Sequence, residues 1–309
     1  MKRTKRTQTA LAAMMLVASI CFASQAFAWG SATHAYICDH LGAQGPLKNL
    51  NELYGGMAPD VFNYLFTDNT LRETLYGATH YSNFLDVWKS SRTPIGKALA
   101  LGFVSHNGLW GADGTAHGVP YNNPDGYVIG KAIAMRFKYG PFFPDGGKID
   151  PNDLTFWLNV ELYHNAVESA VDILICRHDR ALGGKISAAA LARSPEFPAM
   201  LVKTYRSLAP ENLIRGTESD FRRNLVAYGF ALMQPQDKAV EDIASQLASM
   251  AGAFLAMYGI DPSGLGDLDT LAFNIVNLAL EECEGDYLEA VNGMIERVSS
   301  ALKSNHISD

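Results

Sequence analysis

The chain has 309 residues, with 25 basic against 32 acidic side chains and a formal net charge of −7. An acidic surface disfavours non-specific capture of nucleic acid, so we expect no stable nucleic-acid partner. After the first 28 residues no segment holds ~20 uninterrupted apolar residues, so we expect no transmembrane segment in the processed protein.

The first 28 residues have the three parts of a secretory signal peptide. A basic start precedes an apolar run from about Ala10 to Phe22, and an A-x-A cleavage signal ends at Ala28. We therefore predict a secreted or periplasmic protein whose single mature domain is residues 29–309. The leader holds four basic and no acidic residues, which leaves 21 basic against 32 acidic residues and a mature charge of −11.

Helical signals dominate the mature chain. Thr93-Pro94 predicts an N-cap and a first-turn proline for a helix from Ile95 to about Leu109, and Asp150-Pro151 predicts a longer helix reaching about Cys176. Further amphipathic helices are expected over Ala188–Ala192, Asp220–Met233, Ala239–Tyr258 and Leu268–Glu282. Runs of alternating apolar and polar residues long enough for a β-sheet are missing, so we predict an all-α, single-domain multi-helix bundle.

One long irregular segment is expected from Gly118 to Lys148, which is rich in glycine, proline and aromatic residues. Three cysteines remain after processing, and their odd number and wide spacing specify no disulfide. We interpret them as small buried apolar residues.

Two sets of residues have the spacing of metal ligands. His164 and Glu168 are four residues apart on an expected helix, so both side chains project from one face and suit a single Zn²⁺, although a surface ion pair has the same spacing. His106, Asp113 and His117 fall on one stripe if their helix continues. Glycines crowd that segment, and because glycine destabilises a helix, we expect close approach by another backbone or a ligand.

Weaker candidates come from the first part of the mature chain. His34 follows the new amino terminus closely and has helix capping as its alternative. Helix capping explains Asp60 about as well as metal binding does, and His80 is a lone histidine of the kind that is more often structural. The free amine and carbonyl of Trp29 add two more donors of the kind that zinc accepts.

These residues occur in an order that resembles the zinc-dependent phospholipase C family, which shares its fold with the S1/P1 nucleases. The resemblance spans residue 29 to about residue 172 and is carried by Trp29-Gly30, Thr33-His34, Ala58-Pro59-Asp60, Thr79-His80, Ser105-His106, Asp113, His117 and His164-x3-Glu168. It implies a helical bundle of the phospholipase C/P1 nuclease type with three zinc ions.

The resemblance also implies how the ligands are shared. One ion would be held by Asp60, His80, His106 and Asp113. A second would be held by Trp29 and His34, with Asp113 bridging, and a third by His117, His164 and Glu168. Asp60 is in addition the candidate catalytic base. One spacing departs from the bacterial pattern, because six residues rather than three separate His106 from Asp113. Either the helix is interrupted near Gly108 to Gly111, or the bridging role belongs to another residue.

The resemblance implies a phosphodiester hydrolase. Threonine before His34 is similar to the phospholipases, whereas the nucleases more often have glycine there. We therefore expect a monomeric phospholipase C that acts peripherally at a membrane surface and cleaves phospholipid to diacylglycerol and a phosphorylated head group. The alternatives are an S1/P1-type single-strand nuclease or nucleotidase, and a non-catalytic zinc-binding secreted protein.

Overall fold

Helices provide all the regular structure of the residues that the computed structural model describes, which are 30–42, 45–118, 126–142, 144–150, 152–257 and 266–307. These ranges contain fourteen α-helices, two short helices of other kinds and no strand. The predicted all-α, single-domain bundle is therefore confirmed. The leader and Trp29 lie outside the described residues.

The elements are given in chain order. The first part comprises α2 (Ser31–Leu41), α3 (Pro46–Met57), the 3₁₀-helix η1 (Ala58–Tyr64), α4 (Asn69–Gly77), the π-helix η2 (Ala78–Ser82), α5 (Phe84–Ser90), α6 (Pro94–His106) and α7 (Ala112–His117). The second part comprises α8 (Tyr127–Tyr139), α9 (Leu154–His178), α10 (Leu182–Ala192), α11 (Glu196–Tyr205), α12 (Glu211–Leu232), α13 (Gln236–Met257), α14 (Leu268–Cys283) and α15 (Tyr287–Ser304).

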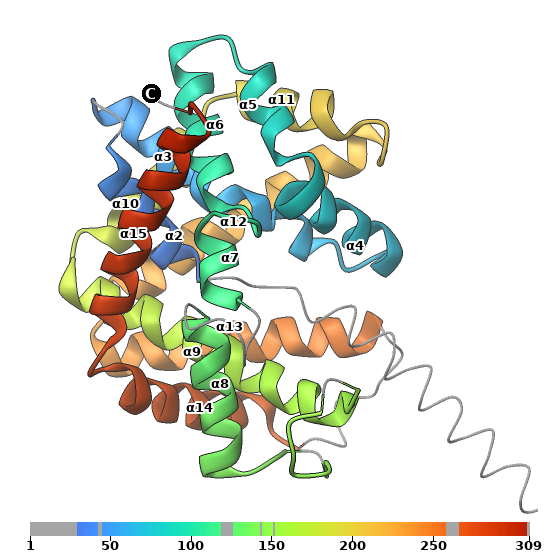
Figure 1. The fold of residues 1–309 in the computed structure, drawn as a ribbon, viewed down its shortest axis with the longest axis vertical. Helices are drawn as coiled ribbons and strands as arrows, with labels where there is room; N and C mark the ends of the chain where they lie inside the picture. The colour runs from blue at the N-terminus through green and yellow to red at the C-terminus, as the bar shows by residue number, and fades with distance from the viewer. Residues whose placement is uncertain are drawn as a thin grey trace, which may run out of the picture.

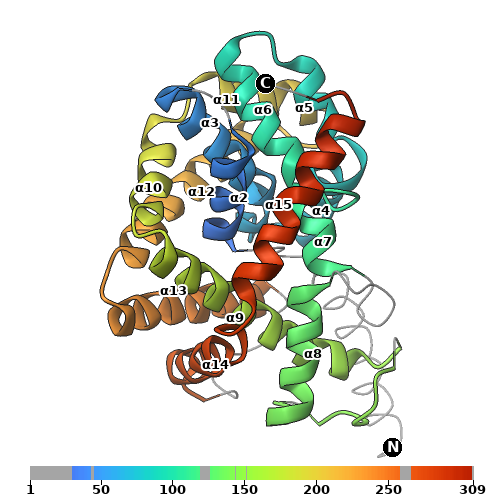
Figure 2. The same ribbon diagram turned by 60° about the vertical axis from the view of Figure 1, so that its left-hand side comes forward.

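The helices fall into two ends joined through the middle of the molecule. Helices α5, α6 and α11 lie at one end and α8 and α14 at the other, while α15 runs along the outside between them (Figures 1 and 2). Helix α9 packs against α8, α13 and α14 and also against α2, so it connects the two ends. One large cluster of buried apolar side chains continues through both ends.

Helices α3 and α6 approach closely because glycines face each other's backbone. A Cβ atom at Gly55 would lie 2.1 Å from the Leu99 carbonyl oxygen, and one at Gly102 would lie 2.0 Å from the Glu52 carbonyl oxygen. Any larger side chain at either position would force the helices apart. The expected close approach of another backbone is thus confirmed at Gly102, and it brings the end of α6 against α3.

The structure corrects two predicted elements. The long helix α9 begins at Leu154 and not after Asp150, because the Asp153 carboxylate caps it by accepting from the Phe156 N–H. The segment from Gly118 to Lys148 is not irregular throughout, since α8 occupies its middle. Three buried apolar residues of α8 (Val128, Ala132 and Met135) share one helical face, a pattern that the aromatic and glycine content obscured.

Two further features of the described residues concern membrane spans and the cysteines. None of the described helices is both long and apolar enough to cross a membrane. Cys38, Cys176 and Cys283 are free and buried, in agreement with their interpretation as small core residues.

Candidate metal centre

The side chains of eight predicted ligands come together in three groups between the two ends of the molecule. Within each group one possible ligand atom of every residue lies within 4.8 Å of the others, and the groups are His34, Asp60 and His106; His80, His106 and Asp113; and His117, His164 and Glu168. We call the first two the deep groups and the third the edge group. The ninth predicted ligand, Trp29, lies outside the described residues.

The grouping refines what the family resemblance implies. The edge group has the three members expected of the third ion. His106 belongs to both deep groups, and His34 lies with Asp60 and His106. Because the two deep groups share a histidine, they form one continuous cluster of imidazoles and carboxylates.

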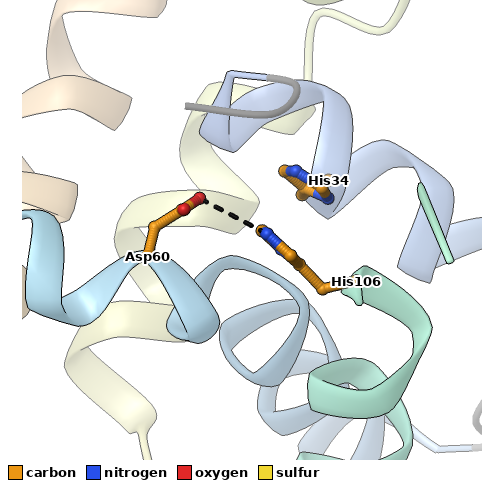
Figure 3. Close-up of side chains that lie close together, drawn as sticks. All are labelled: His34, Asp60 and His106. Carbon is orange, nitrogen blue, oxygen red and sulfur yellow. Dashed lines mark ion pairs between the residues drawn. The ribbon is translucent and has the colours of Figure 1, made fainter. Parts of the chain in front are cut away.

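Asp60 is held in place by the 3₁₀-helix η1, which continues directly from α3. Its Oδ1 accepts a hydrogen bond from Asn63 Nδ2 over 3.0 Å, one turn further along. The same oxygen lies 3.4 Å from His80 Nε2, and Oδ2 lies 3.8 Å from His106 Nε2. Asp60 and His106 face each other in Figure 3, and the His34 ring stacks on that of His106 with centroids 3.8 Å apart.

Main-chain carbonyl groups orient the two deepest histidines. His80 Nδ1 lies 3.0 Å from the Tyr76 carbonyl oxygen, and His106 Nδ1 lies 2.7 Å from the Gly56 carbonyl oxygen. Because a carbonyl oxygen only accepts, Nδ1 carries the proton in each ring and Nε2 is left with a lone pair. The two Nε2 atoms are 3.1 Å apart. Two lone pairs at that distance repel each other unless a cation or a proton lies between them.

The unusual spacing between His106 and Asp113 is explained by a loop that ends one helix and starts the next. Helix α6 ends at His106, and Asn107 Oδ1 accepts hydrogen bonds from the N–H groups of Leu109 and Trp110. A Cβ atom at Gly111 would lie 2.5 Å from the Ser105 carbonyl oxygen, so the turn needs glycine there. Helix α7 then returns Asp113 to the cluster. The interrupted helix is thus the correct alternative, and His106, Asp113 and His117 do not share one helical stripe.

The edge group joins α7 to α9. His164 and Glu168 occupy adjacent turns of α9, and His164 Nε2 lies 2.8 Å from Glu168 Oε1 and 2.7 Å from His117 Nε2. His117 Nδ1 lies 3.1 Å from Asp113 Oδ1, which links the edge group to the deep groups. The side chain of His117 is 21 % exposed, whereas those of His164 and Glu168 are at most 4 % exposed. The edge group is therefore where the cluster reaches the surface.

The pKa values of the histidines shift in opposite directions in the deep groups and in the edge group. Burial lowers the pKa of His80 to about 4, and it also lowers the pKa values of His34 and His106. Burial alone would lower the pKa of His117 too, but the Asp113 carboxylate raises it to about 9. The deep histidines are thus neutral at pH 7, whereas the imidazole of His117 holds a proton.

The residues fit metal ions on three grounds. Burial removes the Asp60 carboxylate from water and raises its pKa to about 7, so a nearby cation would stabilise its charged form. Oδ2 of Asp113 is buried without a hydrogen bond among the described residues, whereas Asp113 Oδ1 and Glu168 Oε1 each lie beside a histidine nitrogen. The Nε2 atoms of His80 and His106 face each other over 3.1 Å, while each ring directs Nδ1 at a main-chain carbonyl oxygen. Cations at these places would satisfy all of these atoms, and imidazole with carboxylate is a donor set that zinc accepts.

The sequence analysis missed two acidic residues of α9. One contacts a candidate ligand, and the other contacts the helix that carries His34. Glu161 Oε2 lies 3.3 Å from Nδ1 of His164. Asp172 is buried and binds the first turn of α2 through its carboxylate. Both lie on the turns that flank His164 and Glu168, at spacings of three and four residues, so extending the helical stripe in both directions would have found them.

Comparison of the chain with models of protein families, with curated proteins and with solved structures finds no match. What the centre does must therefore be argued from its own residues and geometry.

Proposed function

We propose that this chain is a zinc-dependent phosphodiester hydrolase, and that its substrate is a phospholipid cleaved between glycerol and phosphate. The observation that carries the proposal is the edge group, in which three candidate ligands meet and one of them, His117, is partly exposed. Three protein ligands with one side left accessible are typical of catalytic zinc, whereas structural zinc is enclosed by four. The deep groups next to it supply a second and third place for cations.

Zinc ions bound there would neutralise charge on a phosphodiester and acidify water. The chain's own part is to place the base. Asp60 accepts the proton of the attacking water, and the hydrogen bond from Asn63 holds its carboxylate in one orientation. The water oxygen bonds to phosphorus, the bond from phosphorus to the glycerol oxygen breaks, and the proton passes to that oxygen as diacylglycerol leaves.

The sequence favours a lipid over a nucleic acid as the substrate. Threonine precedes His34, which resembles the phospholipases, and the acidic chain opposes capture of a polyanion. In keeping with this proposal, the protein would be exported, monomeric and peripheral at a membrane surface.

A nuclease or nucleotidase is the second candidate, and one contact favours it. Tyr81 directly follows His80, is 36 % exposed, and packs so closely on Gly108 that a Cβ there would lie 2.5 Å from its ring. An exposed aromatic ring beside a metal centre can stack a nucleobase. The third alternative, a non-catalytic protein, was favoured by the spacing between His106 and Asp113. It loses that support because the loop returns Asp113 to the cluster.

One experiment separates the three functions. The purified protein with zinc is given phosphatidylcholine in mixed micelles and, separately, single-stranded DNA. We expect release of diacylglycerol and phosphocholine, loss of that release on chelation, and no release by His164→Ala. Cleavage of DNA alone would establish the second function. Zinc binding without hydrolysis of either substrate would contradict the enzyme proposal.

A further inference from the structure

Asp172 lies on α9 one turn beyond Glu168, and its side chain is fully buried. The N–H of Ala32 and the hydroxyl of Tyr228 each donate to its Oδ2 over 2.8 Å. The N–H and the hydroxyl of Thr33 donate to its Oδ1 over 2.8 and 2.7 Å. Each oxygen thus accepts two hydrogen bonds, which offset part of the carboxylate's loss of water, although burial still raises the pKa of Asp172 to about 6.

The carboxylate of Asp172 takes the place of a helix cap on α2. Gly30 stands at the N-cap of α2 and offers no capping side chain. Asp172 instead accepts from two of the free N–H groups of the first turn and places a negative charge at the positive end of the helix. A Cβ atom at residue 30 would lie 2.3 Å from Asp172 Oδ2, so glycine at this position is what lets α2 and α9 meet.

That first turn of α2 also carries a predicted metal ligand. His34 follows Thr33 directly, and its N–H donates to the Gly30 carbonyl oxygen over 3.2 Å. On α9, Asp172 continues the face that bears His164 and Glu168, at intervals of four residues. One carboxylate therefore ties the turn that presents His34 to the helix that presents the edge group.

We propose that Asp172 is a positioning residue of the metal centre, which keeps His34 in register with the ligands of α9 and does not itself bind metal. The inference rests on the proposed function only in requiring that the cluster bind metal. A fixed ligand binds more tightly than one that must be ordered on binding, and residues that orient ligands contribute 10–100-fold to metal affinity.

The test uses cobalt(II) as the probe, because its visible absorption reports the donors around it. Asp172→Asn keeps the size of the side chain but replaces one acceptor oxygen with an NH₂ group that meets the donors of α2. Tyr228→Phe is the matched control, since it removes a hydrogen bond from the same carboxylate on the α12 side and leaves α2 untouched. Each variant is titrated with cobalt(II) and melted in its metal-free form.

We expect Asp172→Asn to weaken cobalt(II) binding about 10- to 100-fold and to alter the absorption spectrum. Tyr228→Phe should retain cobalt(II) affinity within about twofold of wild type, even if its metal-free form melts at a lower temperature. If both variants lower the melting temperature alike and both keep wild-type affinity and spectrum, Asp172 is structural only and the proposal is wrong.

A second pair of variants decides the matter if Asp172→Asn does not fold. Thr33→Val removes only the hydroxyl donor to Asp172, and Thr33→Ser restores it. We expect weaker cobalt(II) binding in Thr33→Val and wild-type affinity in Thr33→Ser, whereas equal affinities in the two would overturn the proposal. A wild-type protein that binds no cobalt(II) would overturn both this inference and the metal centre. One that binds it without hydrolysing phospholipid would overturn only the proposed function.

Discussion

In the deep groups, His80 and His106 direct Nδ1 at main-chain carbonyl oxygens. In the edge group, the same atom of His117 and of His164 faces a carboxylate. A carbonyl fixes the ring and its tautomer without adding charge, whereas a carboxylate also stabilises the protonated ring. The deep histidines are therefore ready to bind metal at neutral pH, and the edge histidines must first release protons. Under the proposed function, this difference predicts that ions in the deep groups stay bound and that an ion in the edge group exchanges.

The largest difference between the two parts should appear when one histidine is removed from each. His106→Ala and His117→Ala delete the same atoms, and we expect both to abolish hydrolysis. His106→Ala leaves a buried cavity and an unpaired Gly56 carbonyl group, so it should lower the free energy of unfolding by about 3 kcal/mol. His117→Ala, at the partly exposed edge, should lower it by about 1 kcal/mol.

Denaturant unfolding of the two variants, both freed of metal, measures this difference. Equal losses of stability in His106→Ala and His117→Ala would show that the deep and edge parts do not differ in their structural role.

Removal of metal should destabilise the whole protein. The ligands come from helices spread over α2 to α9, so ions bound to the native state alone add to its free energy of unfolding. At free zinc about 1,000 times the dissociation constant, that addition is about 4 kcal/mol for one site. Calorimetry with and without a chelator measures it. A chelated protein that melts at the temperature of the zinc-loaded protein would count against a centre of several ions.

Some features of the fold and of the candidate site are predictable from the sequence, and others are not. The donors are predictable because family order and helical spacing both point to them, as with His164 and Glu168. The sharing of His106 between two groups was not predictable, since it depends on how closely glycines let α3 and α6 approach. The loop at Asn107 is visible in the sequence as an asparagine-glycine pair, but its return of Asp113 to the cluster is a tertiary result. Helix α8 was hidden because aromatic and glycine content outweighed its short apolar face.

The carboxylate of Glu161, which faces Nδ1 of His164, allows a test of the edge group alone. Glu161→Gln keeps the shape of the side chain and removes its charge, so the imidazole of His164 becomes a weaker base and a weaker ligand. We expect zinc affinity of the edge group to fall about 10-fold or more, with the deep groups unchanged. Glu73→Gln, on helix α4, where the Glu73 carboxylate accepts a hydrogen bond from Asn69, serves as the matched control. Isothermal titration of the two variants would reject the orienting role of Glu161 if their affinities agree.

The smallest expected effect is a change of stability with pH. The pKa of His117 is raised to about 9 by Asp113, above its ordinary value of 6.5. Its contribution to the stability of the metal-free protein is therefore fully present below pH 6.5 and is lost as pH rises towards 9. Zinc requires the deprotonated ring, so its affinity should rise over the same window.

The gap in melting temperature between zinc-loaded and metal-free protein should thus widen from pH 6.5 to 9. A gap that stays constant over this range, or that His117→Ala leaves unchanged, would show that no proton is exchanged for metal at the edge group.

The number of zinc ions in wild type and in the two histidine variants tests the central claim most directly. Elemental analysis of the purified proteins should give three ions for wild type and two for His117→Ala. It should give one for His106→Ala, because His106 belongs to both deep groups. A wild-type protein without zinc, or a His106→Ala variant that loses no more zinc than His117→Ala, would contradict the shared cluster.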